Sequence, residues 1–245
     1  MRVAASLSIP VILVMLQACS TVPVNPPEGN AANLNYQLGV GYMQRGHFDV
    51  AQEKLEKALT FQEDFPEVHN ALAVLYDEQG FKELAEEHFQ RAIALDSNYA
   101  LAVKNYGQFL CRNNHPADGE ALLVGLAQSA AASPTAVDAY INAAACALSI
   151  NEYPRAEGYL LSALEIDSQA VVALYRLAEL YYINDDLLQA RAHLRRYHAQ
   201  ARPSPESLWL GVTIEEKLGE EQLRRTFVAR LLEQFPDSAQ AQRLK

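Results

Sequence analysis

The chain has 245 residues, a formal net charge of −10 and a composition in which 50% of the residues are hydrophobic. This length is enough for one extended domain with a substantial core. The acidic balance argues against nucleic acid as a partner, because binding phosphates depends on Lys and Arg. Much of the hydrophobic content is alanine, accompanied by Leu, Glu and Gln, which favours helices.

The first predicted element is a short apolar run that ends at Leu16. A membrane-spanning helix needs roughly 20 apolar residues, so this shorter run predicts a secretory signal peptide over residues 1–18. Leu16, Ala18 and Cys19 resemble the lipobox of bacterial lipoproteins, which implies cleavage before Cys19 and lipidation of that cysteine. Ser20 in place of Asp implies, by the same resemblance, delivery to the outer membrane. The alternative is a plain signal peptide that is cut elsewhere.

Residues 19–31 are predicted to be a lipidated tether. They include Pro23, Pro26, Pro27 and two asparagines, a composition that cannot bury enough surface to fold. Three acyl chains on Cys19 would hold the protein to a membrane far more firmly than one chain. The remaining residues, 32–245, are predicted to form the folded domain.

A 34-residue repeat fills that domain. Small residues recur at fixed positions, which are Gly39, Gly46, Ala51 and Ala58 in the first unit and Ala73, Gly80, Ala85 and Ala92 in the second. The predicted units cover residues 32–65, 66–99, 100–133, 137–170, 171–203 and 204–240. The pattern resembles the tetratricopeptide repeat (TPR), in which each unit is a helical hairpin. The predicted fold is therefore all-α, a right-handed superhelical solenoid of about six hairpins.

The first helices of stacked TPR hairpins line a concave groove. Applying the groove-facing TPR positions to this chain gives five predicted partner-binding residues, Tyr36, Val40, Met43, Asn70 and Val74. The first unit's face is apolar, and its methionine suits adaptable contacts with a peptide. The alternative is that Tyr36 and Met43 simply pack against the tether.

Two further cysteines, Cys111 and Cys146, fall on the first helices of the third and fourth units. Neighbouring units place these helices side by side, at nearly equal height. An exported, oxidising compartment favours a disulfide between them if their Cα atoms come within about 7 Å. The alternative is a pair of buried free thiols.

No catalytic, cofactor-binding or metal-binding motif is recognisable. The six histidines are scattered, and the spacing of His193 and His198 suits one helical face poorly. Paired carboxylates occur only as surface runs, with nothing beside them to raise a pKa. We therefore expect no enzymatic activity, no cofactor, no metal site and no small-molecule substrate.

One local segment is more specific than the repeat. Residues Asn105–Cys111, NYGQFLC, are closely similar to a stretch in the third repeat of the type IV pilus biogenesis lipoproteins of the PilF/PilW kind. That family also carries a second cysteine in the fourth repeat. Together with the lipobox, the tether and the TPR units, the resemblance extends over essentially the whole mature chain.

The resemblance implies a pilotin, a lipoprotein anchored to the periplasmic face of the outer membrane in a Gram-negative bacterium. Such a protein binds the pilus secretin subunit and promotes its localisation and multimerisation in that membrane. Two alternatives stay open. One is a generic TPR scaffold lipoprotein of envelope assembly, serving β-barrel or cell-wall complexes, and the other is a TPR module that activates a cell-wall enzyme.

Overall fold

The computed structural model describes residues 28–244, which form thirteen helices and no β-strand. In chain order these are α1 (Glu28–Met43), α2 (Phe48–Phe61), α3 (Pro66–Gln79), α4 (Lys82–Leu95), α5 (Ala100–Arg112), α6 (Pro116–Ser129), α7 (Pro134–Ser149), α8 (Tyr153–Ile166), α9 (Val171–Ile183), α10 (Leu187–Gln200), α11 (Pro205–Leu218), α12 (Glu221–Gln234) and α13 (Ala239–Gln242). The expected signal peptide and its lipidated Cys19 lie outside the described residues.

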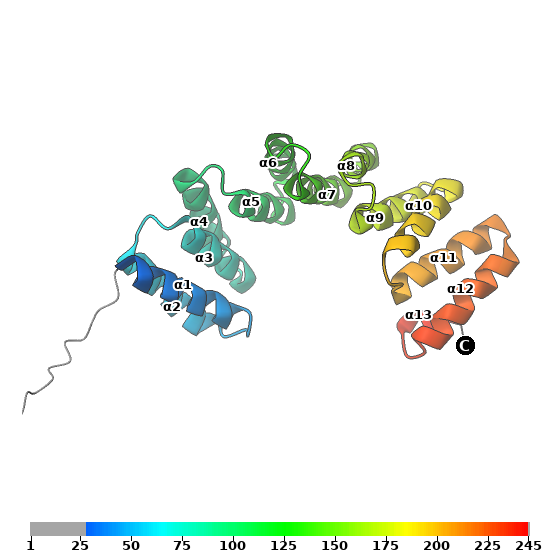
Figure 1. Cartoon of the computed structure of the whole chain (residues 1–245), viewed down its shortest axis with the longest axis horizontal. Coiled ribbons are helices and arrows are strands. Elements are labelled where there is room, and N and C mark those ends of the chain that lie inside the picture. The colour runs from blue at the N-terminus through cyan, green and yellow to red at the C-terminus, as the bar shows by residue number, and fades with distance from the viewer. Residues whose placement is uncertain (1–27, 245) are drawn as a thin grey trace, which may run out of the picture.

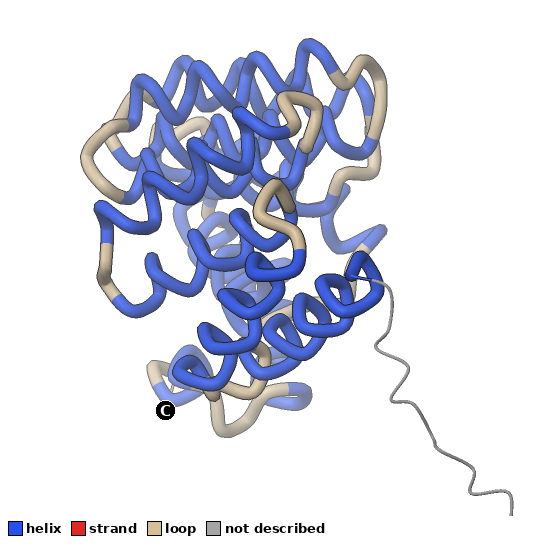
Figure 2. The backbone as a smooth tube through the Cα atoms, turned by 90° about the vertical axis from the view of Figure 1, so that its left-hand side faces the viewer, coloured by secondary structure: helices blue, strands red, loops and turns tan. Residues whose placement is uncertain are grey.

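The first twelve helices pack as six consecutive hairpins, which confirms the predicted all-α TPR architecture. The hairpins follow one another in an arch, with α1 and α2 at one end and α11 and α12 at the other (Figure 1). Viewed from the side, the helices form stacked layers joined by short loops (Figure 2). The odd-numbered helices α3, α5, α7 and α9 lie along the inner side of the arch (Figure 1).

The turns inside the hairpins share one backbone conformation. Gly46 and Gly80 have φ angles of 74° and 85°, in the left-handed region that glycine enters without steric cost. The third, fourth and fifth hairpins use short polar residues in the same region, namely Asn114, Asn151 and Asp185, and the sixth uses Gly219. Each turn reverses the chain within a few residues, so the two helices of a hairpin lie against each other.

Small residues permit this close packing. A Cβ atom added to Gly39 of α1 would lie 2.6 Å from the Leu55 side chain of α2. A Cβ atom on Gly119 of α6 would lie 2.5 Å from the carbonyl oxygen of Gly107 in α5. Larger side chains at these positions would push the paired helices apart, which is the physical reason for the repeating small residues.

At three places, a tyrosine on the first helix of one hairpin hydrogen-bonds to a glutamate on the second helix of the preceding hairpin. Tyr106 of α5 donates to Glu86 of α4 at 2.9 Å, and Tyr181 of α9 donates to Glu157 of α8 at 2.6 Å. A longer bond of the same kind links Tyr76 of α3 to Glu56 of α2. Since each bond runs from the first helix of one hairpin to the second helix of the preceding one, these bonds help to fix the stacking register.

Both ends of the solenoid differ from the expected boundaries. Helix α1 begins at Glu28, so the last residues of the expected tether, 19–31, are helical. Ala31 and Ala32 are buried, and this burial extends the helix toward the N-terminus. At the other end, α13 follows Pro236 as one helical turn, and its Ala241 is fully buried against the last hairpin.

Candidate partner-binding face

The five residues predicted for partner binding lie on α1 and α3. Four of them are half-buried and pack against the hydrophobic core, namely Tyr36, Val40, Met43 and Val74. The fifth, Asn70, is only 6% exposed. The Tyr36 ring lies with its centroid 5.5 Å from that of Phe65. These side chains therefore stabilise the first two hairpins and present only part of their surface to a ligand.

A polar cleft of about 550 Å³ is lined by residues of α3, α4 and α5. Its lining residues are Val74, Asp77, Glu78, Lys82, Phe89, Asn105, Gln108 and Arg112. Val74 is the member of the predicted set that reaches it. Most of the lining is therefore charged or amide side chains, which differs from the apolar face expected of the first unit.

Asp77 is the central charge of this cleft. Arg112 donates from Nη2 to Asp77 Oδ2 at 2.7 Å, and Lys82 pairs with Oδ1 of the same carboxylate. Burial alone would raise the pKa of Asp77, whose side chain is 9% exposed, but the hydrogen bonds from Lys82 and Arg112 hold that pKa below its ordinary value. The carboxylate therefore stays ionised and joins α3, α4 and α5.

Side-chain amides make two further links between inner helices. Asn105 donates from Nδ2 to Asn70 Oδ1 at 3.0 Å, joining α5 to α3. Gln108 donates from Nε2 to Asn142 Oδ1 at 2.6 Å, joining α5 to α7. Because an amide has two donor hydrogens and an acceptor oxygen, each of these groups keeps hydrogen-bonding capacity beyond these contacts.

Two tyrosines, Tyr36 and Tyr99, lie near each other and near Glu67. Burial raises the pKa of Tyr99 to about 12, and nearby Tyr36 and Glu67 add to the rise. Burial, followed by the Glu67 carboxylate, also raises the pKa of Tyr36. Both phenols therefore remain protonated at neutral pH and can donate hydrogen bonds.

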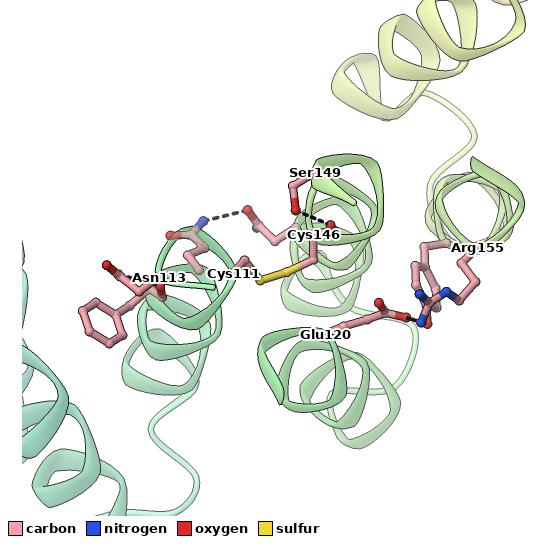
Figure 3. Close-up of a disulfide and its surroundings, with 10 residues drawn as sticks. Cys111, Asn113, Glu120, Cys146, Ser149 and Arg155 are labelled. Atoms are coloured by element: carbon pink, nitrogen blue, oxygen red, sulfur yellow. Dashed lines mark hydrogen bonds and ion pairs between the residues drawn. A yellow bond between two sulfur atoms is a disulfide. The ribbon is translucent and has the colours of Figure 1, made fainter. Parts of the chain in front are cut away.

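The structure joins Cys111 of α5 to Cys146 of α7 by a disulfide, with Cα atoms 5.4 Å apart (Figure 3). Cys146 is almost fully buried, whereas Cys111 is half-buried. Gly119 of α6 makes room for the bridge, since a Cβ atom there would lie 2.5 Å from the Cys111 sulfur. The disulfide and the Gln108–Asn142 bond together fasten the third hairpin to the fourth.

An apolar hollow lies further along the solenoid, outside the predicted set. Its volume is about 470 Å³, and its lining includes Val137 and Ile141 of α7 together with Val171 and Val172 of α9. Val172 is 49% exposed. The solenoid thus carries a polar cleft lined by α3, α4 and α5 and a largely apolar hollow between α7 and α9.

The cross-helix polar contacts were not predicted from the sequence. Asp77 and Arg112 are separated by 35 residues, as are Asn70 and Asn105. A search for opposite charges and paired amides about one repeat apart would have found both contacts. It would also have found Glu120, which is 5% exposed and accepts a hydrogen bond from Arg155, 35 residues away (Figure 3).

Two kinds of site are not found among the described residues. In residues 28–244, no group of three or more His, Cys, Asp or Glu side chains could hold a metal ion. Over the same range, no helix combines the length and the hydropathy that a bilayer crossing requires. The inner side of the arch, with its polar links between hairpins, is the candidate functional surface.

Comparison with known proteins identifies relatives of this chain. Residues 36–100 match the family model described as a tetratricopeptide repeat. The type IV pilus assembly protein PilF of Pseudomonas aeruginosa is 25% identical over 206 residues, which are 84% of this chain and 81% of the relative.

Solved structures agree in fold over nearly the same length. A structure of Pseudomonas aeruginosa PilF superposes with a TM-score of 0.73 at 24% identity, covering 89% of this chain and 98% of that one. A structure of PilW, described as a widely conserved type IV pilus biogenesis factor, gives a TM-score of 0.74 at 26% identity, covering 87% of this chain and 97% of that one. The chain is a PilF/PilW-like tetratricopeptide repeat protein.

Proposed function

We propose that this protein is an outer-membrane lipoprotein that acts as a pilotin for the type IV pilus. It binds the pilus secretin subunit, promotes its localisation and multimerisation in the outer membrane, and so supports pilus biogenesis. The observation that carries the proposal is the similarity to PilF, which extends over 84% of this chain. PilF is a type IV pilus assembly protein, and PilW is a pilus biogenesis factor.

The architecture supports binding rather than catalysis. A TPR solenoid presents a long inner surface to a protein segment, and its neighbouring hairpins are held in register by side-chain bonds. Here the disulfide and the Asp77–Arg112 pair brace the hairpins that border the polar cleft. Bracing lowers the ordering cost of binding, because less of the surface must be immobilised when a partner docks.

The proposed contact surface extends from the α1 residues Tyr36, Val40 and Met43 to Asn70 and Val74 of α3. Val74 also lines the polar cleft, which continues the surface onto α5. A secretin segment that binds here would place apolar side chains against α1 and polar groups in the cleft.

Lipidation of Cys19 is proposed to anchor the protein in the outer membrane. Nine residue steps separate Cys19 from the start of α1 at Glu28, a span of about 30 Å when fully extended. The solenoid would therefore stay close to the membrane in which the secretin assembles. Cys19→Ala should release the protein from the outer-membrane fraction and reduce secretin multimers there.

Gene deletion followed by complementation tests the function. Loss of the protein should abolish twitching and deplete secretin multimers in outer-membrane fractions. Normal twitching and normal multimers would refute the pilotin role and favour a general scaffold of envelope assembly.

Complementing variants test the surface. Tyr36→Ala combined with Met43→Ala should reduce multimers, whereas Leu188→Ala should not, since Leu188 is 66% exposed on α10. Because Tyr36 and Met43 also pack on the core, helix content and thermal midpoint must be measured for each variant. Unchanged multimers with the folded double variant would refute this surface while leaving the pilotin role standing.

A further inference from the structure

One face of α1 is exposed to solvent, whereas the equivalent face of α3, the first helix of the next hairpin, is buried. Leu34 and Leu38 are 54% and 42% exposed. Their counterparts one repeat later, Val68 and Leu72 of α3, are 0% and 1% exposed. Helix α2 packs against α3 and contributes to the core cluster that contains both residues. The first hairpin thus presents apolar side chains at positions that the second hairpin buries.

The later hairpins repeat the covered arrangement. The equivalent positions on α5, α7, α9 and α11 include six residues that are each 0% exposed, namely Ala102, Ala139, Ala143, Ala173, Leu177 and Ser207. In every case the preceding even-numbered helix packs against the helix that carries them. Within residues 28–244, no helix precedes α1 to do the same.

A third position on the same face holds a tyrosine whose hydroxyl needs a hydrogen-bond acceptor. Tyr76 of α3 and Tyr181 of α9 each donate a hydrogen bond to a glutamate on the preceding helix, Glu56 and Glu157 respectively. Tyr42 occupies the same place on α1, two turns beyond Leu34. A helix covering α1 as α2 covers α3 would therefore bring a carboxylate to the Tyr42 hydroxyl.

We propose that Leu34, Leu38 and Tyr42, here named the leading face, receive an amphipathic helix from a protein partner. That helix carries an apolar stripe for the two leucines and an Asp or Glu for the tyrosine. It continues the solenoid by one helix, in the place that α2 takes on α3. This site lies apart from the polar cleft, and its existence does not depend on the proposed pilotin role.

Other occupants fit the leading face less well. The sequence just before α1 includes Pro23, Pro26 and Pro27, and proline lacks the backbone N–H that the interior of a helix uses. A stable dimer buries about 800 Å² on each partner, far more than two leucines and a tyrosine offer. A net charge of −10 opposes binding to an anionic lipid surface. At the far end of the solenoid, by contrast, α13 already covers the last hairpin.

The structure supplies its own probe for this site. A fluorescent peptide with the α2 sequence, residues 48–61, can be held helical by a covalent brace between the exposed positions 53 and 57. Its binding to the purified full chain is measured by fluorescence anisotropy. Saturable binding is expected, and binding should weaken if the peptide carries Glu56→Gln and Leu59→Lys.

Variants of the protein locate the binding. Leu34→Lys combined with Leu38→Lys should weaken peptide binding roughly tenfold or more, because docking buries the exposed half of each leucine side chain and a lysine would lose that gain. The matched control Leu188→Lys changes a leucine that is 66% exposed on α10 and should leave binding within about twofold. Absence of saturable binding, or equal binding by the double variant with unchanged helix content, would overturn the proposal.

Two further measurements distinguish the other occupants. Sedimentation of the unmodified chain should show a monomer, and flotation with phosphatidylethanolamine–phosphatidylglycerol vesicles should be the same for the unmodified chain and the double variant. A dimer that the double variant abolishes would assign the leading face to a second copy. Vesicle binding that depends on the two leucines would assign it to the membrane, and either result would overturn the partner helix.

Discussion

Removing the disulfide between Cys111 and Cys146 should destabilise the middle of the solenoid. The bridge spans a sequence separation of 35 residues. Closing a loop of that length lowers the entropy of the unfolded chain by an amount worth roughly 3–4 kcal/mol at 25 °C. For a chain of this size, a urea m-value of about 2–3 kcal/mol/M converts that free energy into a midpoint shift of roughly 1–2 M.

The assay is urea unfolding followed by circular dichroism at pH 7. The unmodified chain is compared with itself under reductant and with Cys111→Ala combined with Cys146→Ala. The two disulfide-free forms should unfold at nearly the same urea concentration, and both should unfold before the oxidised chain. Identical midpoints for the oxidised and reduced unmodified chain would refute the loop-entropy reasoning.

The loss should also be local, because each hairpin contacts only its neighbours. After reduction, amide hydrogen exchange should accelerate most in α5, α6, α7 and α8, which form the two hairpins that the bridge joins. Helix α12, which the bridge does not touch, is the internal control. An equal acceleration in every helix would show that the solenoid unfolds as one unit and would refute the local account.

Three further predictions concern stability. Acid should lower the unfolding free energy as pH falls below about 6.5. Burial depresses the pKa of His69 and of three other histidines, so the unfolded chain binds more protons than the folded one. A flat urea midpoint from pH 7.5 to 5.5 would contradict this. Gly119→Ala should cost about 1–3 kcal/mol, because its Cβ would lie 2.5 Å from a carbonyl oxygen of α5. The control Gly125→Ala meets nothing within 4 Å and should be neutral or stabilising in the same melt. Arg191→Ala should cost about 3 kcal/mol, since it leaves the Glu215 carboxylate, 4% exposed, without its ion-pair partner; Glu215→Gln added to that variant should recover part of the loss.

The hairpins could be predicted from the sequence because they depend on residues within one unit. Gly39 permits contact between paired helices, and Gly46 and Gly80 take the left-handed turns that end α1 and α3. Such residues act through local sterics, which recur whenever the residues recur. The number and order of hairpins followed directly from their spacing.

The ends of the solenoid could not be predicted in the same way. A repeat is recognised by comparing each unit with its neighbours, and a terminal segment has a neighbour on one side only. Residues 28–31 were predicted to belong to the tether because of the prolines before them. They are helical in the structure, where Ala31 and Ala32 are buried. Helix α13 is too short to repeat the pattern, and it is held by packing against α11 and α12.

The polar cleft was missed for a different reason. Its links run between units, and a link such as Asp77 to Arg112 depends on how far one hairpin rotates and shifts on the next. Period and composition give the height of a residue along the stack but not that rotation. The disulfide could be predicted because two cysteines have few possible partners, whereas a charged residue such as Arg112 has many.

Residues that recur in every unit and residues that differ between units serve different purposes. Where units agree, as in the small residues that pack within each hairpin, the side chains serve a contact that every unit needs. Where units disagree along the inner helices, the side chains serve something that only one place needs. The twelfth unit position holds Met43 in the first unit, Asp77 in the second and Cys111 in the third, which are respectively an apolar contact, a buried charge and a disulfide.

Partner specificity should therefore reside in these unlike residues, and exchanging Met43 and Asp77 should abolish binding even if both hairpins still fold. Retained secretin multimers with such a folded exchange variant would show that the inner face binds through its shape alone.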